Sequence, residues 1–176
     1  MAPKIPATAA LFLEHASPER FRAYLGRPIK AVWAELQATL GSTAFEILSS
    51  QTRARGIPPR TRLSLHPYAS DLKPVSSMSL TLTTEARMKD GIAPAPFVDL
   101  MLATWTTVKA GLAERVGPLT EGKTLYPQKR PVGIAAPALK AALHERHDFG
   151  GGTLVHHAVT GPVLFTYTLA LNVGAG

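Results

Sequence analysis

The chain has 176 residues, of which 45% are hydrophobic, and it carries a formal net charge of +7 with no cysteine. This length and apolar content are typical of one globular domain with a real core. The lack of cysteine excludes disulfides, thiolate zinc sites and a cysteine nucleophile, and it fits a reducing compartment.

Positive charge is concentrated in the first third of the chain. Residues 1–62 hold nine Lys or Arg against four Glu. Glu14 and Glu19 interrupt any apolar core of a secretion signal. The apolar runs elsewhere are much shorter than the roughly 20 residues that cross a membrane. We therefore expect a soluble protein that is made in the cytoplasm and has no membrane partner.

The first third is rich in helix-start signals. Ser17 and Pro18, followed by an acid, suit a helix N-terminus. A second start at Pro28 precedes an apolar stripe that ends at Gly41, a residue suited to a left-handed cap. The stripe consists of Ile29, Val32, Trp33, Leu36 and Leu40. Hydroxyl groups at 42 and 43 with an acid at 46 resemble a capping box, which predicts a third helix through 45–48.

Four segments alternate apolar and polar side chains, as half-buried strands do: 60–67, 76–88, 153–159 and 163–173. A long helix is predicted at 97–116, where Val98, Met101, Trp105, Val108 and Leu112 share one face. Residues 117–132 favour an exposed excursion, and an alanine-rich segment predicts a short helix at 137–147.

Together these patterns predict an α+β fold in a single domain, 1–176. We expect a helical N-terminal part at 1–56 and a sheet with helices at 57–176. One long central helix would pack on an antiparallel sheet of about four strands, with the second face of the sheet in contact with water or a partner.

Four of the six histidines lie close together and raise the question of a metal site. His144 and His147 would share a face of the predicted helix, and His156 or His157 could add a third ligand. Basic side chains also suit the carbonyl end of a helix, and consecutive strand residues point to opposite faces. We favour no metal and no cofactor, and the group of His144, His147 and His157 stays an open alternative.

The sequence contains no pattern that singles out a catalytic residue. A Gly-x-Ser-x-Gly elbow is missing. Gly150–Gly152 precede a strand, whereas phosphate-binding glycine loops follow a strand and open a helix. We interpret these glycines as a turn and expect a protein that is not an enzyme; a histidine–metal enzyme is the least favoured hypothesis.

The best polar candidate for partner contact is a cluster of four arginines. Between Glu46 and Asp71 there is no acid, and this stretch contains Arg53, Arg55, Arg60 and Arg62. If both pairs flank one corner, they could bind phosphates or an acidic protein surface. Tyr68 is the only aromatic residue near them in sequence, which weakens a prediction of single-strand binding.

Two features favour a structural role. The second face of the predicted sheet is dominated by Ser and Thr and suits a flat neighbour, and the predicted loops at 67–76 and 117–132 are longer than usual connections. The leading hypothesis is a non-enzymatic structural subunit of a large assembly, with a bacteriophage virion protein of the tail, neck or capsid-associated type as its concrete form. Its partners would be copies of itself or other subunits. The alternative is a small basic binding protein or inhibitor that contacts nucleic acid or an acidic protein through the arginines.

Overall fold

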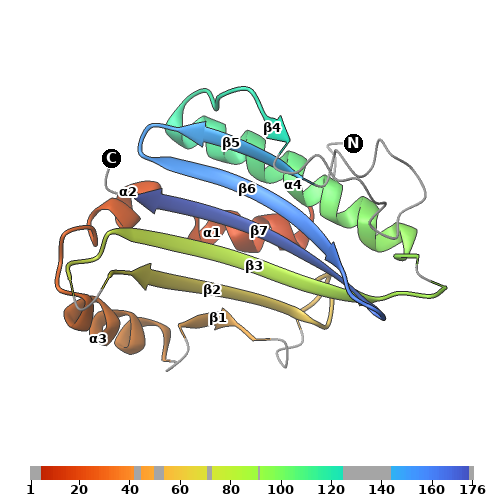
Figure 1. Cartoon of the computed structure of the whole chain (residues 1–176), viewed down its shortest axis with the longest axis horizontal. Coiled ribbons are helices and arrows are strands. Elements are labelled where there is room, and N and C mark those ends of the chain that lie inside the picture. The colour runs from red at the N-terminus through yellow and green to blue at the C-terminus, as the bar shows by residue number, and fades with distance from the viewer. Residues whose placement is uncertain are drawn as a thin grey trace.

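The computed structural model describes residues 5–41, 45–49, 54–70, 73–90, 92–124 and 144–174. Within these residues the fold is α+β, as predicted: one antiparallel sheet has helices packed on one of its faces (Figure 1). No helix of the described part covers the opposite face, which we call the open face. No described helix is both long and apolar enough to cross a membrane.

The described residues form four helices and seven strands. The helices are α1 (Ala7–His15), α2 (Pro18–Arg22), α3 (Ile29–Leu40) and α4 (Ala95–Val116). The strands are β1 (Glu46–Leu48), β2 (Thr61–Tyr68), β3 (Ser77–Arg87), β4 (Lys123–Thr124), β5 (Glu145–Phe149), β6 (Gly152–Thr160) and β7 (Leu164–Gly174). Their order in the sheet is β1-β2-β3-β7-β6-β5-β4, so the sheet is wider than the expected four strands.

The centre of the sheet is the pair β3 and β7. Leu80 lies opposite Leu171 and Leu82 opposite Leu169, and all four are fully buried against the helices. Between them, threonines such as Thr81 point to the open face and are half-buried. The alternation in the sequence therefore predicted both faces of these strands correctly.

Two predicted helix signals are confirmed. The Ser17 hydroxyl accepts a hydrogen bond from the Arg20 backbone N–H, and Pro18 opens α2. Gly41 ends α3 with φ 65°, in the left-handed region that favours glycine. The buried residues of α3 are Ile29, Val32 and Leu36. Trp33 belongs to the predicted stripe of this helix but is 42% exposed.

The long helix α4 connects the sheet to α1. On the sheet side, the ring of Phe97 meets that of Phe165 edge-on, with centroids 5.8 Å apart. On the other side, the hydroxyl groups of Thr8 and Thr104 form a buried hydrogen bond. A Cβ atom at Gly111 would lie 2.8 Å from Leu13 Cδ1, so glycine at this position allows α1 to approach closely.

Two predicted helices were wrong where the structure describes them. Residues 46–48, within the part expected to be helical, form the strand β1, where Leu48 lies opposite Leu63 of β2. Residues 145–149 form β5 instead of the end of a helix, and 137–143 lie outside the described residues. In both places pairing with a neighbouring strand overrides the local signal.

Candidate functional site

Two of the four candidate arginines line a hollow on the open face of the sheet. Arg62 is exposed and projects from β2 away from the buried Leu63, and Arg60 immediately precedes the strand. The hollow measures about 660 Å³ and is lined by Glu46, Arg60, Arg62, Ser64, His66, Thr83 and Glu85. Arg60 Nη1 lies 3.7 Å from Glu85 Oε2, so one arginine already has an acidic partner.

The charges of this hollow are balanced. Two carboxylates, Glu46 and Glu85, stand beside two guanidinium groups, Arg60 and Arg62. Binding to a phosphate backbone depends on an excess of positive charge. A hollow with both signs of charge instead matches a protein surface that also carries both signs.

The other candidate arginines are not part of this hollow. Arg55 lines a separate hollow with Ile5, Ala7 and Leu100, next to the starts of α1 and α4. Arg53 lies outside the described residues. Arg55 and Arg62 therefore face different parts of the surface, and the structure groups only Arg60 and Arg62.

A row of four aromatic rings runs from α3 onto the open face, and we call it the ring row. Its members are Trp33, Phe45, His66 and Tyr68, and the successive centroid distances are 6.5, 5.8 and 6.4 Å. Trp33 and Tyr68, at the two ends, are 42% and 53% exposed. His66 also lines the hollow with Arg62, so the ring row and the charged hollow form one continuous surface.

His66 contributes an uncharged ring to this surface. Burial lowers the pKa of His66 below its ordinary value, and the nearby Glu46 carboxylate opposes that shift only in part. The imidazole is therefore uncharged at neutral pH, with an apolar ring face and polar nitrogen atoms at its edge.

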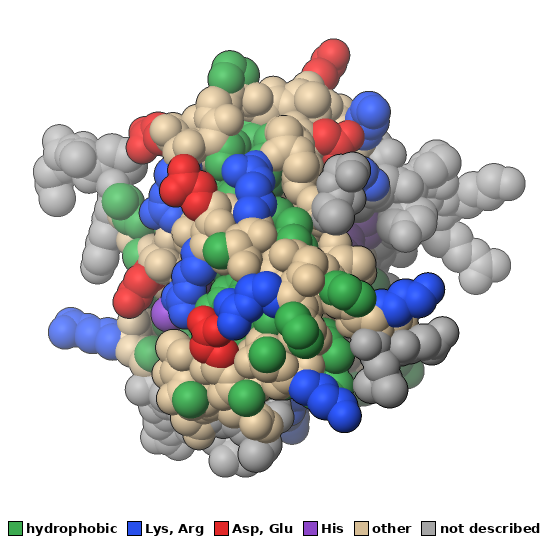
Figure 2. All heavy atoms as spheres, turned by 90° about the vertical axis from the view of Figure 1, so that its left-hand side faces the viewer, with side chains coloured by type: hydrophobic (Ala, Val, Ile, Leu, Met, Phe, Trp, Pro, Cys, Tyr) green, Lys and Arg blue, Asp and Glu red, His purple; other side chains and the backbone are tan. Residues whose placement is uncertain are grey.

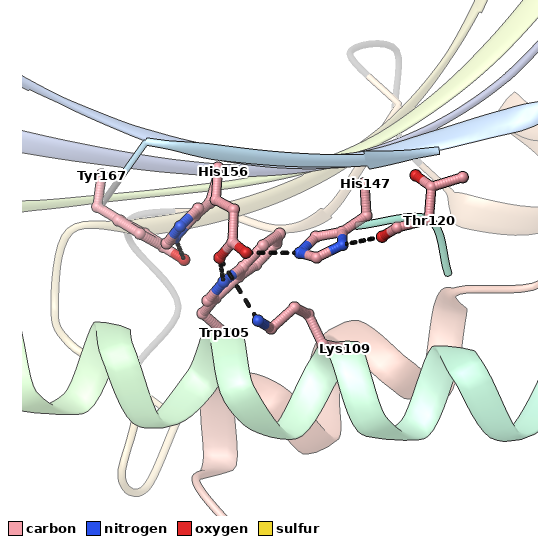
Figure 3. Close-up of polar contacts among 7 residues, drawn as sticks. Trp105, Lys109, Thr120, His147, His156 and Tyr167 are labelled. Carbon is pink, nitrogen blue, oxygen red and sulfur yellow. Dashed lines mark hydrogen bonds and ion pairs between the residues drawn. The ribbon is translucent and has the colours of Figure 1, made fainter. Parts of the chain in front are cut away.

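A second set of polar groups lies between α4 and the sheet (Figure 3). Glu145 is at its centre. Its Oε2 accepts hydrogen bonds from Trp105 Nε1 at 2.7 Å and from Lys109 Nζ at 3.4 Å, and its Oε1 lies 2.8 Å from His147 Nε2. His147 Nδ1 lies 2.7 Å from the Thr120 carbonyl oxygen. Both ring nitrogens of His147 thus lie within hydrogen-bond distance of an oxygen atom, one from Glu145 and one from Thr120.

These contacts also fix the charge of Glu145. Burial alone raises the pKa of a carboxyl group, but the hydrogen bond from Trp105 and the charges of Lys109 and His147 outweigh it and hold the pKa of Glu145 below its ordinary value. The network is therefore an anion surrounded by donors.

His156 of β6 adds a buried neutral ring. It is fully buried, its Nδ1 lies 3.0 Å from the Tyr167 hydroxyl, and its Nε2 has no hydrogen-bond partner among the described residues. Burial, reinforced by the charges of His144 and Lys109, lowers the pKa of His156 to about 2. Burial also raises the pKa of Tyr167 well above its ordinary value, so both groups are uncharged at neutral pH.

The predicted histidine group is divided between the two faces of the sheet. His147 faces α4, whereas His157 lies opposite Thr168 and projects from the open face. The described residues contain no cluster of three metal-ligating side chains. Glu145 and His147 resemble an acid–base pair, but they bind each other, and Glu145 also accepts hydrogen bonds from Trp105 and Lys109 of α4. This arrangement joins the two layers of the fold.

No family model, curated protein or solved structure matches this chain. The assignment of the candidate site therefore depends on its geometry alone. Sequence reasoning missed the ring row because Trp33, Phe45 and His66 come from three separate segments. The signal that was available is the polar face of β2, because Arg62, His66 and Tyr68 are separated by even numbers of residues and so point to the same side of the strand.

Proposed function

We propose that this protein is a non-enzymatic structural subunit that packs against copies of itself through the open face of the sheet. The observation that carries the proposal is the ring row beside the charge-balanced hollow. Trp, Tyr and Arg dominate the binding energy of protein interfaces. Trp33, Tyr68 and Arg62 provide these residue types, exposed and contiguous, on one surface.

The charge pattern favours a second copy as the occupant. In a two-fold contact the same patch meets itself, so each charged group needs an opposite charge within the patch. Arg60 and Arg62 with Glu46 and Glu85 meet this condition. The threonines of β3 and β7 next to the hollow carry no charge, so their burial costs little when their hydroxyl groups find partners.

The assembly that we propose is a bacteriophage virion, in a tail, neck or capsid-associated position. Such particles repeat one subunit contact many times, which is compatible with a self-complementary patch. The virion setting stays a prediction. Electron microscopy of the purified protein at rising concentration tests it, since a subunit of this kind should form discrete rings, tubes or sheets.

Light scattering coupled to size exclusion tests the contact itself. The average mass of the wild type should rise with concentration, and the double variant Trp33→Ser, Tyr68→Ser should stay at the monomer mass. Ile5→Ser is the matched control, because Ile5 is 61% exposed but precedes α1 and lines the hollow with Arg55, away from the open face. Equal masses for the wild type and the double variant would contradict the proposal.

The ring row also favours a second candidate, binding of single-stranded nucleic acid, because bases stack on exposed aromatic rings. Fluorescence anisotropy with labelled oligonucleotides at low salt separates the two functions. Binding that weakens with salt by a log–log slope of about −0.7 per phosphate, and that the Arg62→Ser variant lacks, would support this candidate. A monomeric wild type that binds no oligonucleotide would contradict both.

A further inference from the structure

A third hollow lies at the end of the molecule where α2 comes close to the end of α4. It measures about 630 Å³ and is lined by Ala16, Ser17, Pro18, Glu19, Arg22, Arg115, Val116 and Gly150. Figure 2 faces this end, the left-hand side of Figure 1, and shows several Lys and Arg side chains across its middle, with Asp and Glu side chains among them. Two arginines and one glutamate line the hollow, which gives it an excess of positive charge.

Arg115 is held in place by the end of α1. Its Nη1 donates to the carbonyl oxygens of Leu13 and Ala16, each at 2.6 Å. Carbonyl groups at the end of a helix have no partner within the helix, so the guanidinium group satisfies two of them. The second Nη and the Nε of Arg115 are not used in these two bonds.

Arg22 is held in a similar way by the turn between β5 and β6. Its Nη2 donates to the carbonyl oxygen of Gly150. A Cβ atom at Gly151 would lie 3.7 Å from Arg22 Nε, so the guanidinium group lies directly against this turn. Within the described residues, neither Arg22 nor Arg115 forms an ion pair with a carboxylate.

We propose that this hollow binds the phosphate group of a small phosphorylated molecule. A guanidinium group has five N–H donors in a rigid fork that matches phosphate oxygens. Arg22 and Arg115 line one hollow, are oriented by backbone carbonyl oxygens and keep most of their donors. Orientation before binding reduces the entropy cost of binding, and 630 Å³ is within the usual size range of small-ligand sites.

Isothermal titration of the full chain, at constant ionic strength, tests the site with glycerol 2-phosphate, inorganic phosphate and acetate. We expect glycerol 2-phosphate to bind and Arg22→Gln to weaken it about tenfold or more, since a hydrogen bond to a charged group contributes about 1.5 kcal/mol or more. Arg22→Lys should restore part of the affinity. Arg20→Gln is the matched control on the same short helix, because Arg20 does not line the hollow.

Arginine side-chain NMR gives a second measurement, which identifies the arginines that the ligand contacts. Glycerol 2-phosphate should shift the Nε–H signals of Arg22 and Arg115 and leave that of Arg20 unchanged. Inorganic phosphate binding as tightly as the monoester would assign the site to free phosphate and overturn the small-molecule proposal. Equal affinity in Arg22→Gln and Arg20→Gln, equal binding of acetate, or no binding would overturn the site altogether. These results do not depend on self-association through the ring row.

Discussion

The indole ring of Trp105 lies flat against the imidazole ring of His156, with centroids 3.8 Å apart and an interplanar angle of 5°. Trp105 comes from α4 and His156 from β6, so the stack joins the helical layer to the sheet. The same indole donates its N–H to Glu145. Trp105 therefore contributes both a stacked face and a polar edge to the contact between α4 and the sheet.

Replacing Glu145 with Ala should destabilise the protein by about 2 to 3 kcal/mol, because buried donors of Trp105 and His147 lose their acceptor. Urea unfolding followed by circular dichroism measures the change. Asp148→Ala is the control: this carboxylate pairs with Arg146 near the surface, and exposed pairs contribute little. If the two variants lose the same stability, the buried network does not hold α4 in place.

Stability should fall in mild acid because of His156. Burial, more than the nearby charges, lowers the pKa of His156 from 6.5 to about 2. Below pH 6.5 the unfolded chain binds a proton at this ring and the folded protein does not. The contribution of neutral His156 to the free energy of unfolding is therefore fully present above pH 6.5 and declines below it. Between that pH and about pH 5, we expect the free energy of unfolding to fall by about 2 kcal/mol because of this residue.

The variant His156→Gln isolates this effect. Unfolding in urea at the two pH values should show a smaller loss for the variant than for the wild type. His66 and His157, whose pKa values are also lowered by burial, contribute equally to both proteins. An identical loss in the two proteins would show that His156 takes up its proton without unfolding.

Phe165→Ala should destabilise the protein by about 3 to 5 kcal/mol, because the side chain is fully buried and its removal leaves a cavity. Thr166, the next residue, points to the open face and is only half-buried, so Thr166→Ala should cost much less. Thermal unfolding by calorimetry compares the two. Similar, small effects would mean that the faces of β7 are assigned the wrong way round.

Two neighbouring glycines should respond very differently to alanine. A Cβ atom at Gly152 would lie 2.6 Å from the Asn172 carbonyl oxygen and would also clash with the Phe149 ring, whereas nothing lies within 4 Å of one at Gly150. We expect Gly152→Ala to cost about 1 to 3 kcal/mol and Gly150→Ala to be nearly neutral. Equal melting temperatures for the two variants would contradict the close contacts that Gly152 makes with Asn172 and Phe149.

Helices α2 to α4 and strands β2, β3, β6 and β7 could be predicted because their caps and alternating apolar residues agree with the final structure. Strand β5 could not, because two of its inward residues, Glu145 and His147, are polar and give no apolar alternation. Strand β1 has only three residues and depends on pairing with β2.

The candidate site was only partly predictable, because some of its contacts join segments that are far apart in the sequence. The predicted strand at 60–67 placed Arg62 and His66 on one face, since alternation alone determines which side chains share a face, but it ended before Tyr68, which the structure adds to β2. The contact of Phe45 with both Trp33 and His66 could not be read from spacing. It depends on how a loop and a helix pack beside the edge of the sheet, which local patterns do not encode.

The strand order has a consequence for how the chain is made. β7 is the last of the seven strands in chain order, yet it lies between β3 and β6 in the middle of the sheet. A ribosome-bound chain that has not yet released Leu164–Gly174 therefore presents two partial sheets, each with an unpaired inner edge that can recruit other nascent chains. Its solubility during synthesis should depend on chaperones that shield β3 and β6 until β7 emerges.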